Sequence, residues 1–136
     1  MKSKNSLIRD VMTRGVVTVS IKNTCKQVTK ILSKKDFSGV CVVGDDGKAV
    51  GIISYMDLLK IIGKDNWENM TVESIMTPNL ETVEPTSTLI EAANIMKTKH
   101  VHRLLILSER GMGISQTPIG IVSVRDIVRE SAKEYI

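Results

Sequence analysis

The chain has 136 residues, of which 42% are hydrophobic and 25% are charged, so it is the size of one ordinary domain and is expected to fold. Its formal net charge is +4, spread over the first half, where residues 8–62 hold nine Lys and Arg against five Asp and Glu. This mild excess is weak support for a nucleic-acid-binding face, and the lack of a long apolar run excludes a membrane span.

The chain contains an internal repeat. A shift of 64 residues aligns residues 12–43 with 76–107 at seven identities in 32 positions. A shift of 69 residues aligns Gly51–Asp57 with Gly120–Asp126. The five extra residues fall in the loop Ser108–Thr117, where an insertion costs little.

The repeat divides the chain into three parts: a first repeat at residues 7–63, a connector at 64–71 and a second repeat at 72–131. Each repeat alone has too few residues to bury much apolar surface, so we expect the two to pack face to face as one compact module.

Both repeats predict the same order of elements, strand–helix–strand–strand–helix, and hence an α+β fold. In each, a Thr-x-x-Gln/Glu capping box opens the first helix and a short apolar run forms a buried strand. In the first repeat the elements are strand Val16–Val19, a helix opening at Thr24, strand Val40–Val43, a turn at Gly44–Gly47, strand Ala49–Ile53 and helix Tyr55–Ile62. In the second they are strand Leu80–Val83, a helix opening at Thr88, strands Leu104–Leu107 and Ile119–Val122, and helix Val124–Arg129.

The strongest local signal is Gly-apolar-apolar-Ser-x-x-Asp, which occurs once in each repeat. A strand that ends at a helix N-terminus presents free N–H groups, which favour an anion. Ser54 and Ser123 would donate to a phosphate oxygen there, while Asp57 and Asp126 can only accept, which suits the hydroxyls of a ribose. The alternative is a plain helix cap, in which Ser caps and Asp favours the helix dipole. The recurring glycine favours a ligand role, and the two interpretations are compatible.

A second signal is the pair His102-Arg103, just before a predicted strand of the second repeat. Arg103 offers a planar set of donors suited to phosphate, and His102 adds a donor or a pH-sensitive charge. The first repeat has Ser38-Gly39 here, so the two repeats are expected to differ in their affinity for a charged ligand. Arg125, next to Asp126, is a weaker candidate, and a solvated polar loop is the alternative.

Other kinds of site find little support in the sequence. Cys25 and Cys41 have no Cys-x-x-Cys partner and align with leucines, which predicts core positions rather than a metal site. With only two histidines, no nucleophile–base pair has supporting context, so we expect no enzyme activity. The N-terminus lacks the apolar core of a secretory signal, which predicts a cytoplasmic protein.

At these residues the chain resembles a tandem pair of CBS domains, the modules named after cystathionine β-synthase. The resemblance covers Leu7 to Ser131 and rests on Met12-Thr13, Met76-Thr77, the Thr-Val strands, Glu91-Ala92 and the two Gly-x-x-Ser-x-x-Asp segments. Val101–Leu104 is also similar to the phosphate-contacting segment in the γ subunit of AMP-activated protein kinase.

The resemblance implies two β-α-β-β-α repeats related by pseudo-twofold symmetry, with clefts that bind AMP, ADP, ATP or S-adenosylmethionine. Asp57 and Asp126 would then hold ribose hydroxyls, Ser54 and Ser123 would approach phosphate, and His102 and Arg103 would neutralise it. The adenine pockets would be lined, partly by backbone groups, by Thr18, Val19, Gly39, Val40, Thr82 and Val83.

The sequence therefore predicts a non-catalytic adenosine-ligand sensor that forms a homodimer and signals to a partner in trans, because the chain is too short for a further domain. Two alternatives remain open: an interaction scaffold without a ligand, and a weak nucleic-acid binder that uses the basic first repeat.

Overall fold

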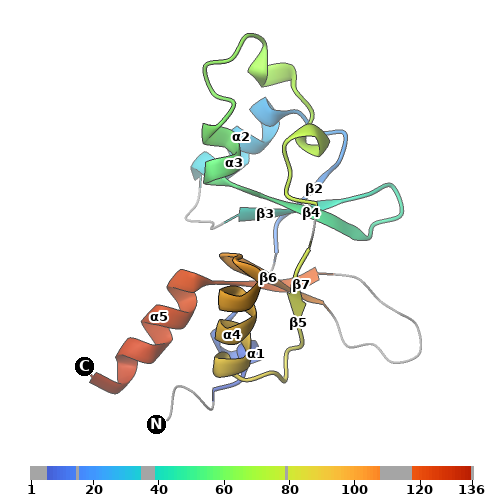
Figure 1. Cartoon of the computed structure of the whole chain (residues 1–136). Coiled ribbons are helices and arrows are strands. Elements are labelled where there is room, and N and C mark those ends of the chain that lie inside the picture. The colour runs from blue at the N-terminus through green and yellow to red at the C-terminus, as the bar shows by residue number, and fades with distance from the viewer. Residues whose placement is uncertain (1–5, 15, 35–38, 79, 108–117, 136) are drawn as a thin grey trace. The chain divides into compact units, whose positions relative to one another are not determined.

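The structure is a computed structural model that describes residues 6–14, 16–34, 39–78, 80–107 and 118–135. It confirms the predicted order of strands and helices in both repeats (Figure 1). The chain divides into two units, Val17–Leu80 and the combination of Met1–Val16 with Glu81–Ile136. The predicted insertion loop Ser108–Thr117 lies outside the described residues.

The unit Val17–Leu80 is a three-stranded sheet with helices on one face (Figure 1). Its strand order is β2-β3-β4, with β2 parallel to β3 and β3 antiparallel to β4. The elements are β2 (Thr18–Ser20), α2 (Cys25–Lys34), β3 (Gly39–Val43), β4 (Ala49–Ser54), α3 (Tyr55–Leu59) and the 3-10 helices η2 (Trp67–Asn69) and η3 (Val72–Ser74).

The second unit repeats this plan and adds one strand. Its sheet has the order β1-β7-β6-β5, in which β5 is parallel to β6 and the other neighbours are antiparallel. The elements are α1 (Ile8–Val11), β1 (Thr13–Arg14), β5 (Thr82–Val83), α4 (Leu89–Lys99), β6 (Arg103–Leu107), β7 (Pro118–Ser123), α5 (Val124–Ala132) and the 3-10 helix η4 (Lys133–Tyr135).

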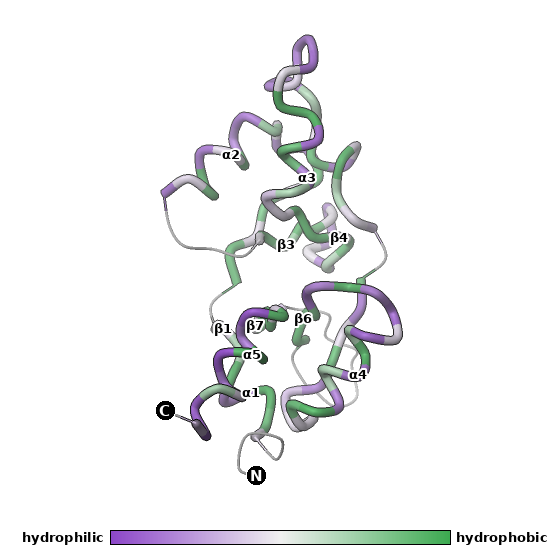
Figure 2. The backbone as a smooth tube through the Cα atoms, turned by 60° about the vertical axis from the view of Figure 1, so that its left-hand side comes forward, coloured by the Kyte–Doolittle hydropathy of each residue, from purple (hydrophilic) through white to green (hydrophobic). Residues whose placement is uncertain are grey.

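Each unit has its own hydrophobic core between the sheet and the inner faces of its helices. The central strand β3 and residues Leu104–Leu107 of β6 are apolar (Figure 2), and most of these residues are buried. Cys25 and Cys41 are fully buried and free, as their alignment with leucines predicts. Burial raises the pKa of the Cys41 thiol to about 11 and also raises that of Cys25. Both thiols therefore stay protonated and unreactive at neutral pH.

The first residues of each repeat pack in the unit that holds the strands and helices of the other repeat. Ile8, which precedes the first repeat's strands, is buried in the second unit, where its N–H donates to the carbonyl of Ser87 (2.8 Å). The equivalent residue Val72 is buried in the unit Val17–Leu80, where its N–H donates to the carbonyl of Asn23 (3.0 Å). Ile8 of the first repeat thus completes the core of the second repeat, and Val72 of the second repeat completes the core of the first.

The same exchange explains the glycine of the Gly-x-x-Ser-x-x-Asp motif. A Cβ on Gly120 would lie 2.5 Å from the sulfur of Met12 and 3.0 Å from the carbonyl oxygen of Thr13. A Cβ on Gly51 would meet Met76 and Thr77 at the same distances. The close crossing of a Met-Thr segment thus accounts for this glycine by packing alone, and its link to a ligand stays a prediction.

Smaller differences from the sequence prediction lie at the ends of elements. Helix α3 ends at Leu59 and continues as turns, whereas α5 runs on to Ala132. The short elements α1 and β1 were not predicted, because four and two residues carry too little periodicity to be recognised.

The glycine crossing generates a first prediction. Replacing Gly120 with Ala should lower the free energy of unfolding by about 1–3 kcal/mol, since the added methyl group forces Met12 and the Thr13 backbone apart. Urea denaturation monitored by circular dichroism measures the change.

The matched control is Gly44→Ala, whose Cβ would lie 3.4 Å or more from its neighbours and should change stability by less than about 0.5 kcal/mol. An equal loss in both variants, or none in Gly120→Ala, would contradict the packing role.

Candidate functional site

The N-termini of α3 and α5 are built in the same way. Each helix begins directly after a strand, and the last strand residue, Ser54 or Ser123, is the N-cap in extended conformation. In the second repeat the Ser123 N–H donates to Asp126 Oδ2 (2.8 Å), and the Asp126 N–H donates to Ser123 Oγ (3.2 Å). In the first repeat the corresponding distances are 2.9 Å and 3.4 Å for Ser54 and Asp57.

The helix-cap interpretation of Ser-x-x-Asp is therefore confirmed in both repeats. The caps occupy Oδ2 of each carboxylate, and Oδ1 takes no part in them, so each carboxylate keeps a further acceptor. Ser54 and Ser123 are only 8% and 6% exposed, and the Ser54 hydroxyl also donates to Asp57 Oδ2 (3.1 Å). The aspartates are thus better placed than the serines to receive an additional hydrogen bond.

Arg103 lies beside the second of these caps. It is the first residue of β6 and pairs directly with Ser123 in the antiparallel β6–β7 ladder. Its side chain is half-buried and its Nε atom is buried. His102, the preceding residue, is exposed, and its carbonyl accepts a hydrogen bond from the Val124 N–H (3.0 Å). The structure therefore brings His102, Arg103, Ser123 and Asp126 together at one end of one sheet.

The first repeat has the same framework without the cation. Gly39 begins β3 and pairs with Ser54, the relation that Arg103 has to Ser123. Ser38, the predicted counterpart of His102, lies outside the described residues. The guanidinium in one repeat and a bare backbone in the other make the two clusters chemically different.

The candidate adenine-pocket residues begin the neighbouring parallel strands. Thr18 of β2 pairs with Cys41, and Thr82 of β5 pairs with Leu105, two residues along from Gly39 and Arg103. Both threonines are exposed at the same ends of their sheets. The side chains of Val19, Val40 and Val83 are buried in the two cores, so a ligand would meet these residues through their backbone.

Arg125 lies apart from this pattern. It is the second residue of α5, and its side chain is exposed next to Asp126. It adds positive charge to the start of α5, which follows Ser123, the strand partner of Arg103.

The sequence analysis missed a groove between α2 and α3. This apolar hollow of about 300 Å³ is lined by Thr29, Leu32, Ser33, Tyr55, Met56, Leu58, Leu59 and Ile62. The available signal was the excess of apolar residues in Tyr55–Ile62, which exceeds what the single buried face of a short helix uses.

Two kinds of site are not found in the described part of the chain. Among the described residues no group of three or more His, Cys, Asp and Glu side chains could hold a metal ion. No helix within the described ranges has the length and apolar character needed to cross a membrane.

Comparison with known families gives a match over most of the chain. Residues 8–64 and 72–133 match the CBS domain, once in each repeat. The matched residues are thus two CBS repeats and contain no separate catalytic domain. The capped starts of α3 and α5 are built in the same way, which agrees with this double match.

Among curated proteins, the uncharacterized protein MJ0188 of Methanocaldococcus jannaschii is 32% identical over 93% of this chain and 44% of its own length. An L-aspartate semialdehyde sulfurtransferase of Methanosarcina acetivorans is 26% identical over 95% of this chain, which spans 24% of that protein. The chain therefore spans less than half the length of these relatives.

Among solved structures, the CBS domain pair of MJ0100 in complex with 5′-methylthioadenosine and S-adenosyl-L-methionine has a TM-score of 0.82. It is 25% identical, and the match covers 95% of this chain and 98% of that one. CBSX2 in complex with AMP has a TM-score of 0.74 at 24% identity, covering 96% of this chain and 99% of that one, which shows the shared fold.

The cap geometry generates a second prediction. Asp126→Ala should lower the free energy of unfolding by about 0.5–2 kcal/mol, because it removes the acceptor for the Ser123 N–H. Asp126→Asn keeps an oxygen acceptor at this position and should lose less. Chemical denaturation of both variants measures the difference, and equal losses would show that the charge, not the cap, stabilises the helix.

Proposed function

The chain belongs to the CBS domain family, and from this premise we propose that it is a regulatory module that binds an adenosine-type ligand and signals to a partner protein. The ligand class comprises AMP, ADP, ATP and S-adenosylmethionine with its relatives. The binding of S-adenosyl-L-methionine and 5′-methylthioadenosine by the similar MJ0100 pair supports this class.

The observation that carries the proposal is the pairing of Arg103 with Ser123, whose N–H donates to the Asp126 carboxylate. A guanidinium binds phosphate through a planar pair of donors, and a carboxylate oxygen accepts from the hydroxyls of a ribose. A nucleoside phosphate carries both groups. The cluster of the second repeat therefore suits AMP, ADP or ATP.

The cluster of the first repeat suits a ligand with less negative charge. Asp57 keeps the ribose acceptor, but Gly39 supplies no cation at the position of Arg103. In our proposal Thr18, Val19, Gly39 and Val40 contact adenine through backbone groups in this repeat. Thr82 and Val83 do so in the second repeat, where His102 and Arg125 add to the phosphate site and Ser54 and Ser123 hold the caps.

Regulation follows from differential affinity. A ligand shifts the conformational equilibrium only if it binds one arrangement of the protein more tightly than another. In this proposal the ligand stabilises one arrangement of the regulatory module, and a partner protein in the cytoplasm recognises that arrangement.

A third prediction tests the ligand class. Arg103→Gln should weaken AMP binding about 10- to 100-fold, because a charge-assisted hydrogen bond contributes about 1.5–3 kcal/mol. The same variant should keep its affinity for 5′-methylthioadenosine, which has no phosphate. Titration calorimetry on protein stripped of carried-over ligand measures both.

The matched control is Arg129→Gln, which removes an exposed arginine of α5 outside the cluster and should leave both affinities unchanged. If wild-type protein gives neither heat nor a melting shift with AMP, ADP, ATP, S-adenosylmethionine or 5′-methylthioadenosine, the sensor proposal fails and the scaffold alternative stands.

The chain is further proposed to form a homodimer through α5. Val124 and Val128 are exposed one turn apart on this helix. Arg125 lies in the first turn of this helix, while Glu130 lies near its end. Two copies of the helix side by side in antiparallel orientation would place Arg125 of each copy near Glu130 of the other, which supports pairing of like surfaces.

A fourth prediction tests this dimer. Val128→Asp places a charge in the proposed interface and should convert the dimer to monomer in sedimentation-velocity experiments. The variant should remain folded, since Val128 is 60% exposed. A wild-type protein that sediments as a monomer, or a variant that stays dimeric, would contradict the α5 interface.

A further inference from the structure

Glu81 is a half-buried acidic residue in the sheet of the second unit. It directly precedes β5, and its carbonyl accepts a hydrogen bond from the Leu105 N–H (3.0 Å). Val17 holds the equivalent place in the other unit, where its carbonyl accepts a hydrogen bond from the Cys41 N–H (3.0 Å). The two backbones therefore correspond, and the two repeats differ here in the side chain.

Alternation along the strand places the Glu81 side chain on the face of the sheet that carries the core. Successive side chains of a strand point to opposite faces, and Val83, two residues further on, is buried in the core of its unit. In the other unit Val17 has the same relation to the buried Val19, and it packs against that core. A carboxylate thus stands at the edge of one core where the first repeat has an apolar contact.

This carboxylate differs from the other half-buried carboxylates in the described part of the chain. Two of these accept the hydrogen bonds of the helix caps. Glu130 pairs with Lys133 (2.8 Å), and Glu134 also has an interaction partner. Within the described ranges, no hydrogen bond or ion pair involves the Glu81 carboxylate. Removing a charge from water without a partner costs free energy, so the folded protein alone gains nothing from this residue.

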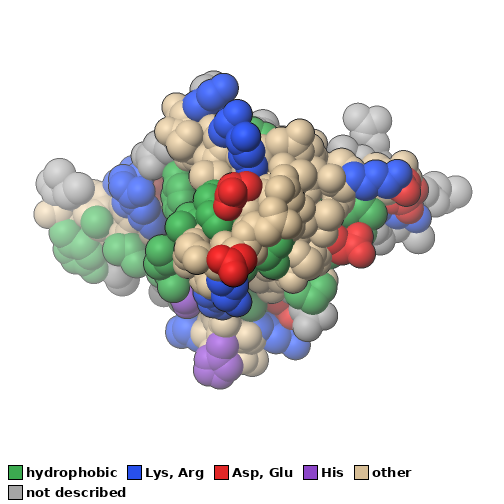
Figure 3. Space-filling view, turned by 90° about the horizontal axis from the view of Figure 1, so that it is seen from above, with side chains coloured by type: hydrophobic (Ala, Val, Ile, Leu, Met, Phe, Trp, Pro, Cys, Tyr) green, Lys and Arg blue, Asp and Glu red, His purple; other side chains and the backbone are tan. Residues whose placement is uncertain are grey.

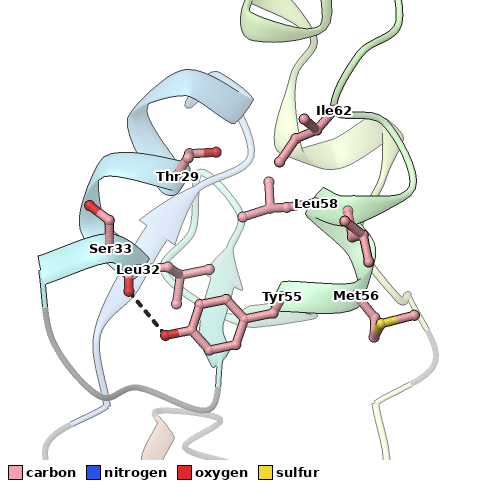
Figure 4. Close-up of a pocket in the computed structure, with 8 residues that line it drawn as sticks. Thr29, Leu32, Ser33, Tyr55, Met56, Leu58 and Ile62 are labelled. Atoms are coloured by element: carbon pink, nitrogen blue, oxygen red, sulfur yellow. Dashed lines mark hydrogen bonds between the residues drawn. The ribbon is translucent and has the colours of Figure 1, made fainter.

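Solvent contact accounts for exposed acidic residues but not for Glu81. The Asp and Glu side chains visible on the surface in Figure 3 keep contact with water and need no partner in the protein. The Tyr55 hydroxyl belongs to a residue that is 47% exposed, and it still donates to the carbonyl of Leu32 (3.0 Å, Figure 4). A more exposed polar group thus has a partner, which indicates that the Glu81 carboxylate serves a group from outside the chain.

Glu81 lies at the same end of the sheet as the groups assigned to ribose and phosphate. In the strand order β7-β6-β5, Arg103 begins the middle strand, Glu81 precedes one neighbour and Ser123 ends the other. Adjacent strands are about 4.8 Å apart, so two strand spacings, about 10 Å, separate the backbones of Glu81 and Ser123. Asp126 follows in the first turn of α5. Acidic residues therefore stand on both sides of the strand that Arg103 begins.

We propose that Glu81 selects the base at this site and that its carboxylate accepts a hydrogen bond from the 6-amino group of adenine. This inference rests on the proposed function, in which Asp126 contacts the ribose and Arg103 the phosphate of the same nucleotide. The amino group is the donor that adenine presents, whereas its ring nitrogens are acceptors that a carboxylate does not bind. The first repeat, with Val17 at this place, lacks this selection.

The test compares AMP with purine riboside 5′-monophosphate, which differs from AMP only in lacking the 6-amino group. Titration calorimetry on protein stripped of carried-over ligand should give an affinity for AMP that is at least about tenfold higher, because a hydrogen bond to a charged acceptor contributes about that factor. The site concerned is the one that Arg103→Gln weakens. Both nucleotides carry the same phosphate, so the ratio of their affinities reports the base alone.

Variants of Glu81 assign the preference to this carboxylate. Glu81→Val introduces the residue of the first repeat and should lower the ratio to about one, with the affinity for purine riboside 5′-monophosphate unchanged. Glu81→Gln keeps an oxygen acceptor without the charge and should give an intermediate ratio. The matched control is Glu84→Gln, which removes an exposed carboxylate three residues away and should keep the wild-type ratio. Urea denaturation should show that Glu81→Val is at least as stable as wild type, because an unpaired half-buried charge is gone.

The outcomes separate this inference from the proposed function. A ratio near one in wild-type protein, or an unchanged ratio in Glu81→Val, would overturn the role of Glu81 while AMP binding still supports the proposed function. Absence of binding by both nucleotides would overturn both. Tighter binding of GMP than of AMP, lost in Glu81→Val, would overturn the assignment to adenine and assign the carboxylate to guanine.

Discussion

A backbone segment crosses a strand at a glycine in each repeat, and the rest of the structure depends on this crossing. Met12 lies against Gly120 and Met76 against Gly51, so the crossing backbone comes closer than any side chain would allow. Next to each crossing, Ile8 or Val72 fills the core of the same unit. The first residues of one repeat are thereby part of the core formed by the other repeat. Neither core is complete without residues from both repeats.

The caps that follow the glycines connect folding with the proposed function. The Ser-x-x-Asp box satisfies the first N–H groups of α3 and α5 and leaves Oδ1 of each aspartate outside the cap. The same helix cap in both repeats thus leaves one aspartate oxygen in each, on Asp57 and Asp126, that can accept a hydrogen bond from a ligand. The difference in ligand preference is assigned to the residue opposite each cap, which is Arg103 in one repeat and Gly39 in the other.

The two repeats keep the same interior and differ on the outside. Buried positions such as Leu58 and Ile127, or Val42 and Ile106, remain apolar because both units need a closed core. Exposed positions on the helices of the two repeats have no such constraint. There Lys26 aligns with Ile90, and Met56 aligns with Arg125. Duplication thereby provides one framework whose exposed residues differ between the two repeats.

The sequence by itself determined the repeat, the order of the elements, the buried strands and the helix caps, because periodicity and capping depend on residues that lie close together in the chain. It also identified Arg103 as the distinguishing cation, since the alignment sets it against Gly39. Only the tertiary structure decided why the motif glycine is there, that the leading segments are exchanged, and that α2 and α3 leave an apolar groove. These features depend on contacts between distant residues, such as Met12 with Gly120 or Tyr55 with Leu32, which no local pattern encodes.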